Sequence, residues 1–218
     1  MRPLVIIDMQ TGFRDCFNKD TLTGCQNEIR QAMKRRDWVF FVQYDGYGDI
    51  DRRLTRVADG YPYKKRVWKW KDDGSDKIIL RLIKLGLVRL KPTFDLNDWI
   101  IKYHEWTYTD EIVATQRKFR RAVVSAPAEL RLCGVNLDYC VEETYGGLWK
   151  QLGKTDITIC ASAVHTEQND MALAMVLKSW KNKGNQRIEG KREVLRVLNA
   201  KIEAEEKAVT ISSTRAVA

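Results

Sequence analysis

The most constraining feature of this sequence is a set of short, uninterrupted apolar runs separated by segments with helical patterning. The first run, Leu4-Val5-Ile6-Ile7, contains no polar residue and stops at Asp8. A continuous β-branched run of this length is typical of a strand that is buried on both faces, as in a parallel sheet. The sequence predicts further strands of this kind at 38–42, 66–69, 130–135 and 157–163.

Segments with helical patterning lie between these runs. Ser75 is a suitable N-cap for one predicted helix, and Gly153 ends another. Strands that alternate with helices predict an α/β fold, a doubly wound parallel β-sheet flanked by helices in a Rossmann-like three-layer sandwich. The predicted helices are at 21–36, 78–87, 138–152, 166–181 and 189–207.

The composition argues against a membrane protein and against a secreted disulfide scaffold. The longest apolar runs, such as Leu4–Ile7 and Trp38–Val42, are too short to span a bilayer. The start of the chain lacks the long apolar stretch and small-residue cleavage site of a signal peptide. The five cysteines are an odd number without CxxC spacing. We therefore expect a cytoplasmic protein that does not associate with membranes.

Chemically suitable residues follow three of the predicted strands, where reactive groups of parallel α/β sheets lie. These are Asp8, Lys69 and Cys140, the last near the start of a predicted helix. Alone, Asp8 could cap a turn, Lys69 could be a solvated charge and Cys140 a small buried residue. Together they predict a nucleophilic site in which the helix start favours a thiolate, Asp8 accepts the thiol proton and Lys69 stabilises the thiolate. The remaining cysteines are predicted to be structural: Cys16, Cys25, Cys133 and Cys160.

Three segments resemble the isochorismatase-like cysteine hydrolases, a family that includes nicotinamidases and N-carbamoylsarcosine amidases. The segment 4–10, Leu-Val-Ile-Ile-Asp-Met-Gln, resembles the opening strand of that family. The segment 134–141, Gly-Val-Asn-Leu-Asp-Tyr-Cys-Val, resembles its nucleophile motif, and Val67-Trp68-Lys69 resembles its lysine strand. The resemblance covers roughly residues 3–87 and 129–180, in the order Asp, Lys, Cys that the family has.

The resemblance implies a Cys–Asp–Lys triad of Cys140, Asp8 and Lys69, with Lys71 as the alternative lysine. Cys140 would attack a carbonyl carbon, Asp8 would act as general base and then acid, and Lys69 would orient both. A non-proline cis peptide is implied between Val135 and Asn136, with the backbone N–H groups of Asn136 and Cys140 forming an oxyanion hole.

The implied activity is metal-independent hydrolysis of a C–N bond in a small amide or ureido substrate, through a thioester. Nicotinamidases of this family hold a divalent metal through an Asp and two His residues beside the second strand. Here Asp45 has no histidine neighbour, and His104 and His165 are distant in sequence. We therefore expect no metal and no cofactor, which makes nicotinamidase a less favoured activity. The alternatives are an isochorismatase-type vinyl-ether hydrolase and a non-catalytic binding or assembly protein on the same fold.

Compared with the family, this chain has an insertion at about 88–128 inside the expected main domain, 1–185. Insertions of this length are usually lids, interface arms or specificity elements. Its aromatic residues could line a pocket, or pack on the sheet or a neighbouring subunit: Trp99, Tyr103, Trp106 and Tyr108. A basic helical C-terminal extension is expected over 186–218.

The formal net charge of +9 comes largely from basic clusters at 64–71 and 178–201. We expect both clusters to be solvated, since no zinc-finger, RNP or helix-turn-helix signature supports the alternative, docking to nucleic acid. The first cluster leads into the lysine strand, which favours a slightly electropositive site mouth and anionic substrates. The expected partners are a small-molecule substrate and further copies of the chain, as a dimer or tetramer.

Overall fold

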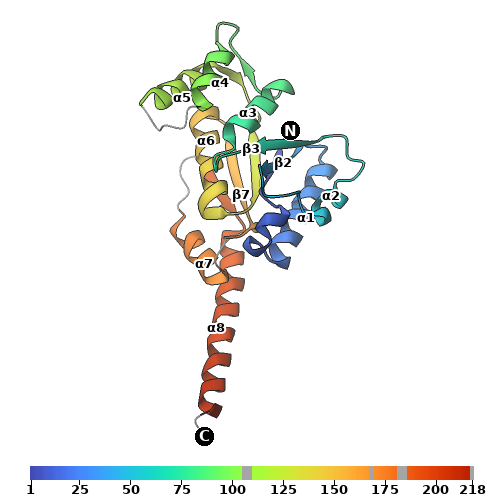
Figure 1. The fold of residues 1–218 in the computed structure, drawn as a ribbon, viewed down its shortest axis with the longest axis vertical. Coiled ribbons are helices and arrows are strands. Elements are labelled where there is room, and N and C mark those ends of the chain that lie inside the picture. Colours follow the sequence, from blue (N-terminus) through green and yellow to red (C-terminus); the bar gives the residue numbers. More distant parts are fainter. Residues whose placement is uncertain (105–109, 167–168, 181–185, 217–218) are drawn as a thin grey trace.

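The architecture is a central parallel sheet with helices on both faces (Figure 1). The computed structural model describes residues 1–104, 110–166, 169–180 and 186–216. Within these residues one six-stranded sheet has the order β3-β2-β1-β6-β7-β8, and all of its neighbouring strands are parallel. The predicted doubly wound α/β fold is therefore confirmed. The strands are β1 (Leu4–Ile7), β2 (Val39–Tyr44), β3 (Lys64–Lys69), β6 (Glu129–Gly134), β7 (Asp156–Val164) and β8 (Gln186–Glu189).

The apolar run of β1 is explained by burial on both faces of this sheet. Leu4 and Ile6 pack in one core with residues of α1 and α2, whereas Val5 and Ile7 pack in the other core with residues of α3 and α6. Successive side chains of a strand point to opposite faces, so a central strand needs apolar residues at every position. The helices are η1 (Thr11–Cys16), α1 (Lys19–Lys34), α2 (Arg52–Val57), α3 (Ser75–Lys84), α4 (Leu96–His104), α5 (Asp110–Ala122), η2 (Leu137–Val141), α6 (Glu142–Leu152), α7 (Asp170–Ser179) and α8 (Lys191–Ala216).

The segment 88–128 contains α4, α5 and an antiparallel ribbon of β4 (Arg89–Leu90) and β5 (Val123–Ser125). Trp99 of α4 is buried, and its ring lies 4.7 Å from that of Phe119 on α5. The indole N–H of Trp99 donates a hydrogen bond of 3.1 Å to Gln151 of α6. Trp99 therefore packs within the protein against α5 and α6. The side chains of His104, Tyr103, Trp106 and Tyr108 lie outside the described residues.

Two local expectations differ from the structure. The N-cap of α3 is Gly74 rather than Ser75, because the Asp73 carboxylate accepts a hydrogen bond from the backbone N–H of Ser75 and draws that residue into the first turn. The first residues of the expected C-terminal extension form the edge strand β8 and belong to the sheet. Beyond β8, helix α8 extends away from the rest of the molecule (Figure 1). No helix in the described part of the chain is long and apolar enough to cross a membrane.

Candidate active site

The three predicted site residues lie at the carboxyl edge of the sheet. From β1 the sheet continues through β2 and β3 on one side and through β6, β7 and β8 on the other, so β1 and β6 flank its topological switch point. Ligands of open α/β sheets bind in the crevice outside this point. Asp8 directly follows β1, Lys69 ends β3, and Cys140 lies in η2, the turn of π-helix that starts three residues after β6.

Asp8 and Lys69 form a buried ion pair. Lys69 Nζ lies 2.8 Å from Asp8 Oδ2, and the two side chains are 0% and 1% exposed respectively. The ammonium also donates hydrogen bonds to the backbone carbonyls of Lys71, at 3.2 Å, and Asp72, at 3.1 Å. It lies 4.5 Å from the centroid of the Tyr44 ring. The structure thus brings Lys69 to Asp8, whereas Lys71 contributes a backbone carbonyl to the Lys69 ammonium.

The protonation of this pair is set by burial and by the opposite charges. Burial raises the pKa of Asp8 above its usual value, although the Lys69 ammonium and the Cys140 thiol act to lower it. For Lys69, burial acts to lower the pKa, but the Asp8 carboxylate and the Cys140 sulfur outweigh it and the pKa is raised. Lys69 therefore remains an ammonium at neutral pH.

Asp8 combines its ion pair with an unusual backbone conformation. Among the described residues, neither carboxylate oxygen of Asp8 accepts a hydrogen bond of regular geometry. Its φ of 53° lies in the left-handed region, which costs an L-residue about 1–2 kcal/mol. Such conformations persist where the surrounding structure holds them, often at functional sites. A buried carboxylate of this kind is suited to accepting a proton from a neighbouring thiol.

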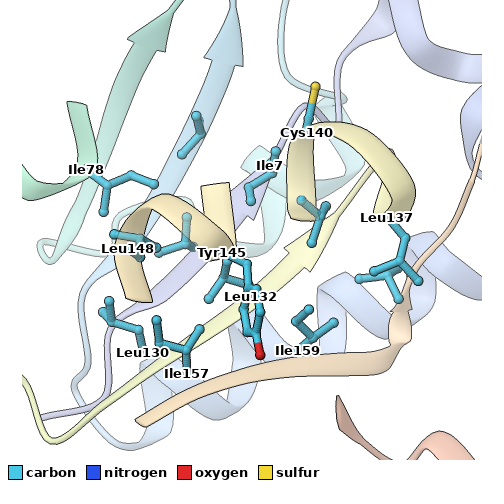
Figure 2. Close-up of a cluster of buried hydrophobic side chains, with 14 of the residues drawn as sticks. Ile7, Ile78, Leu130, Leu132, Leu137, Cys140, Tyr145, Leu148, Ile157 and Ile159 are labelled. Carbon is cyan, nitrogen blue, oxygen red and sulfur yellow. The ribbon is translucent and has the colours of Figure 1, made fainter. Parts of the chain in front are cut away.

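Cys140 presents a neutral thiol to this pair. The side chain is only 5% exposed, and Figure 2 shows its sulfur atom pointing away from the apolar side chains of the core. Burial, followed by the negative charge of Asp8, raises the pKa of the Cys140 thiol, and Lys69 does not offset these effects. The expectation that the helix start favours a thiolate is therefore wrong. Reaction at Cys140 would require a base to remove the proton, and the Asp8 carboxylate interacts with this thiol.

The segment between β6 and Cys140 carries the predicted oxyanion donors. The peptide bond between Val135 and Asn136 is cis. The carbonyl of Asn136 accepts hydrogen bonds from the backbone N–H groups of Tyr139, at 3.2 Å, and Val141, at 3.0 Å. No acceptor for the N–H of Asn136 is found within the described part of the chain. That N–H group is therefore available to a bound oxygen atom.

Gly134 allows β6 to approach β1 at this point. Its φ is +116°, and a Cβ added here would lie 2.0 Å from the carbonyl oxygen of Ile7. The same carbonyl accepts a hydrogen bond of 2.9 Å from the N–H of Val135. Only glycine permits this contact, which places the turn after β6 against the end of β1, where Asp8 lies.

Two further residues of the site were not predicted from the sequence. The Cys140 thiol donates a hydrogen bond of 3.4 Å to Asp72 Oδ1, in the turn between β3 and α3. The Thr144 hydroxyl on α6 accepts a hydrogen bond from the N–H of Gly74, at 3.0 Å, and donates one to the carbonyl of Asp72, at 3.3 Å. Neither residue was predicted, because no local pattern in the sequence indicates a contact across about 70 residues.

Two of the residues considered for a metal, Asp45 and His165, have different surroundings. Asp45 is exposed at the end of β2. The ring of His165 contacts the carbonyl of Thr166, at 2.6 Å, and the Asp170 carboxylate, at 3.2 Å. Over the residues that the structure describes, no three His, Cys, Asp or Glu side chains are grouped so as to hold a metal ion. The other four cysteines are also buried, and they form no disulfide: Cys16, Cys25, Cys133 and Cys160.

Comparisons with known proteins identify the fold. No protein-family model matches the sequence, and no curated protein is significantly similar to it. Among solved structures, a nicotinamidase from Staphylococcus aureus is 14% identical, with a TM-score of 0.57 over 86% of this chain and 96% of that chain. A protein from Chromobacterium violaceum, proposed to be a hydrolase of the isochorismatase family, is 13% identical, with a TM-score of 0.55 over 91% and 94%.

A third similar structure, from Leishmania major, is proposed to be a ribonuclease. It is 11% identical, with a TM-score of 0.51 over 91% of this chain and 83% of that chain. Because identities are this low, the likeness concerns the fold. At that level the resemblance found in the sequence is confirmed: the chain has the three-layer α/β fold of the nicotinamidases and isochorismatase-family proteins.

Proposed function

We propose that this protein is a cysteine-dependent hydrolase that cleaves a C–N bond of a small amide or ureido substrate through a thioester at Cys140. The observation that carries the proposal is the Asp8–Lys69 ion pair of 2.8 Å, buried next to a thiol whose pKa is influenced by both residues. A buried ion pair costs desolvation energy that a structural site rarely needs, and strongly perturbed groups cluster at active sites. The fold likeness to a nicotinamidase supports the same reaction class.

The first half of the proposed reaction forms the thioester. Asp8 accepts the proton of the Cys140 thiol as the sulfur attacks the carbonyl carbon, and Lys69 stabilises the negative charge of the attacking sulfur. The carbonyl oxygen becomes an oxyanion, which the N–H groups of Asn136 and Cys140 stabilise. When the C–N bond breaks, Asp8 returns its proton to the departing nitrogen, which leaves as ammonia or an amine.

The second half releases the acyl group. Asp8, again a carboxylate, accepts a proton from a water molecule whose oxygen attacks the thioester carbon. The C–S bond breaks, the acid product leaves and the proton returns to the sulfur, so the enzyme is regenerated without a redox change. The raised pKa of Asp8 suits this role because the best acid–base catalyst has a pKa near the working pH.

The test is detection of a covalent adduct by intact-mass spectrometry after incubation with a panel of small amides and ureido compounds. We expect an acyl adduct on the wild type and none on Cys140→Ser. Cys16→Ser is the matched control, because Cys16 is 6% exposed against 5% for Cys140 and lies outside the site. An adduct that survives in Cys140→Ser, or a Cys140 thiol that reacts with neither substrates nor alkylating reagents, contradicts the proposal.

The two alternatives predict different outcomes. A vinyl-ether hydrolase of the isochorismatase type does not need a cysteine nucleophile, so Cys140→Ser would retain its turnover. A non-catalytic binding protein would show no adduct and no dependence on Asp8 or Lys69. The ion pair and the thiol lie together at the carboxyl edge of the sheet, which favours the cysteine mechanism over both alternatives.

A further inference from the structure

Asp72 places a negative charge directly beside the sulfur of Cys140. Its Oδ1 accepts the thiol hydrogen bond of 3.4 Å, and its side chain is otherwise exposed to solvent. Within the described residues, Asp72 takes part in no ion pair. Its charge also acts to raise the pKa of both Asp8 and Tyr44. The carboxylate is therefore an uncompensated charge at the point where a substrate carbonyl must approach.

The position of this carboxylate is set by its backbone rather than by a charged partner. The carbonyl of Asp72 accepts hydrogen bonds from the Lys69 ammonium, at 3.1 Å, and from the Thr144 hydroxyl, at 3.3 Å. The N–H of Gly74, two residues on, donates to the same hydroxyl. Gly147 on α6 permits the close contact, since a Cβ there would lie 2.2 Å from Ser75 Oγ. The turn is therefore held between β3 and α6 with the Asp72 side chain beside the thiol.

Two basic residues near this turn, Lys69 and Lys77, are paired with other groups. Lys69 is neutralised by Asp8, and the Lys77 ammonium lies 3.8 Å from the centroid of the Trp70 ring and 3.4 Å from Asp76 Oδ2. Earlier in β3, the Lys64 ammonium lies 3.9 Å from the Asp59 carboxylate, and the Arg66 guanidinium lies 3.8 Å from the Asp49 carboxylate. None of these four ion pairs of basic residues involves the Asp72 carboxylate.

We propose that Asp72 is a specificity-determining residue that selects substrates with an N–H-bearing or cationic group next to the scissile carbonyl and disfavours anionic substrates. This proposal rests on the proposed function, because it concerns the substrate class of the same thiol. An attacked carbonyl carbon lies about 3–3.5 Å from the sulfur, so its substituents fall within direct reach of the Asp72 carboxylate. The net charge of +9 and the basic run at 64–71 predicted the opposite preference.

The test uses the reactivity of Cys140 toward small methanethiosulfonates of different charge, which does not depend on turnover. In this reaction the thiolate attacks the reagent sulfur that carries the ethyl or methyl group. The S–S bond of the reagent breaks, a mixed disulfide forms and methanesulfinate is released. The probes are the cationic 2-(trimethylammonio)ethyl reagent, the anionic 2-sulfonatoethyl reagent and the neutral methyl reagent. Rates are measured on the full chain at low salt, and the rates of Cys140→Ser are subtracted to remove the reaction of the other cysteines. The remaining rates are divided by those of a free thiol in solution, which removes the intrinsic reactivity of each reagent.

We expect the wild type to react faster with the cationic reagent than with the anionic one. A unit charge at roughly 7 Å in water changes each rate about 2.7-fold, so Asp72→Asn should lower the cation-to-anion ratio about sevenfold. Asp72→Glu should keep most of the preference. Asp59→Asn is the matched control for charge, because Asp59 is an exposed carboxylate near the opposite end of β3 and its removal should leave the ratio unchanged.

The outcomes separate the two proposals. If the neutral reagent does not modify Cys140, the proposed function fails and the specificity proposal fails with it. If Cys140 reacts with the neutral reagent but the ratio is the same in wild type and Asp72→Asn, only the role of Asp72 is overturned. A wild-type preference for the anionic reagent also overturns it. Thermal unfolding of each variant confirms that it is folded, and Asp72→Ser provides a second neutral variant.

Discussion

Replacement of Lys69 by methionine tests the central ion pair most directly. The substitution keeps an unbranched side chain of similar length but leaves the 1%-exposed Asp8 carboxylate without its cation. At 2.8 Å and an effective dielectric constant of 20, the lost attraction is about 6 kcal/mol. The desolvation cost of Lys69 is removed at the same time. We therefore expect a net loss of about 3–5 kcal/mol in the free energy of unfolding at pH 7, as for other broken buried pairs.

The loss should depend on pH with a defined sign. The pKa of Asp8 is already raised in the folded wild type, and without Lys69 it rises further. A folded carboxyl with a raised pKa binds a proton more readily than the unfolded one, so stability falls as the pH rises from the unfolded pKa to the folded pKa. The difference between wild type and Lys69→Met should therefore shrink as the pH is lowered towards about 4, near the unfolded value for Asp.

The assay is urea denaturation of wild type and variants at a series of pH values. The double variant Asp8→Asn, Lys69→Met removes both charges and should recover most of the stability at pH 7. Lys71→Met is the matched control and should cost less than about 1 kcal/mol, because only the backbone carbonyl of Lys71 contacts the Lys69 ammonium. A loss below 1 kcal/mol in Lys69→Met, or one that is the same at pH 4 and pH 8, would refute a buried Asp8–Lys69 pair.

Four further predictions concern the surroundings of the pair and the assembly. Gly134→Ala should lower the free energy of unfolding by about 3 kcal/mol, because the added Cβ would lie 2.0 Å from the Ile7 carbonyl oxygen. Gly146→Ala should instead raise it by about 0.5–1 kcal/mol, because the added Cβ meets open space and alanine favours the helix α6. The same urea titrations measure both variants. Alkylation of Cys140 by iodoacetamide should keep accelerating above pH 9, because its pKa is raised; a plateau near pH 8.5 in the rate profile would contradict this. Thr144→Val should cost about 1–2 kcal/mol in urea denaturation by leaving a buried backbone N–H unpaired, and an unchanged midpoint would show that the turn is held in another way. The expected dimer or tetramer stays a prediction. Light scattering of the purified chain tests it, and a monomeric mass would contradict it.

Much of the fold was accessible from local patterns. The residues of β1 lie on both faces of a central strand, and such a strand must be apolar throughout, so the run itself indicated a parallel sheet. The edge strand β8 was not predicted, because an edge strand is covered on fewer sides and its sequence, Gln-Arg-Ile-Glu, has no apolar run. The segment 88–128 was also hard to assign, because its elements pack on one another and on α6 rather than in the sheet.

Some residues of the candidate site were likewise predicted from local patterns, and others were not. Asp8 and Lys69 were predicted because carboxyl ends of parallel strands meet at one edge, so residues that directly follow strands come together. Cys140 was predicted from its place near a helix start that follows a strand, and the resemblance gave it the role of nucleophile. Asp72 and Thr144 were missed because the contact of Asp72 with the thiol and the contact of Thr144 with the same turn each span about 70 residues.

The sequence by itself determined the sheet and the three groups that its edge brings together, because strand burial and strand direction are encoded in local patterns of apolar residues. Only the tertiary structure decided how those groups are charged. The helix start at Cys140 predicted a thiolate, but the pKa of a thiol depends on its burial and on its distances from Asp8 and Lys69, which no local pattern contains. The basic run at 64–71 predicted a positive site mouth, and the fold adds what the run does not contain: Lys64 and Arg66 lie near other carboxylates, and Asp72 lies beside the sulfur. Electrostatic energies follow distances in space, so they are settled only when the chain has folded.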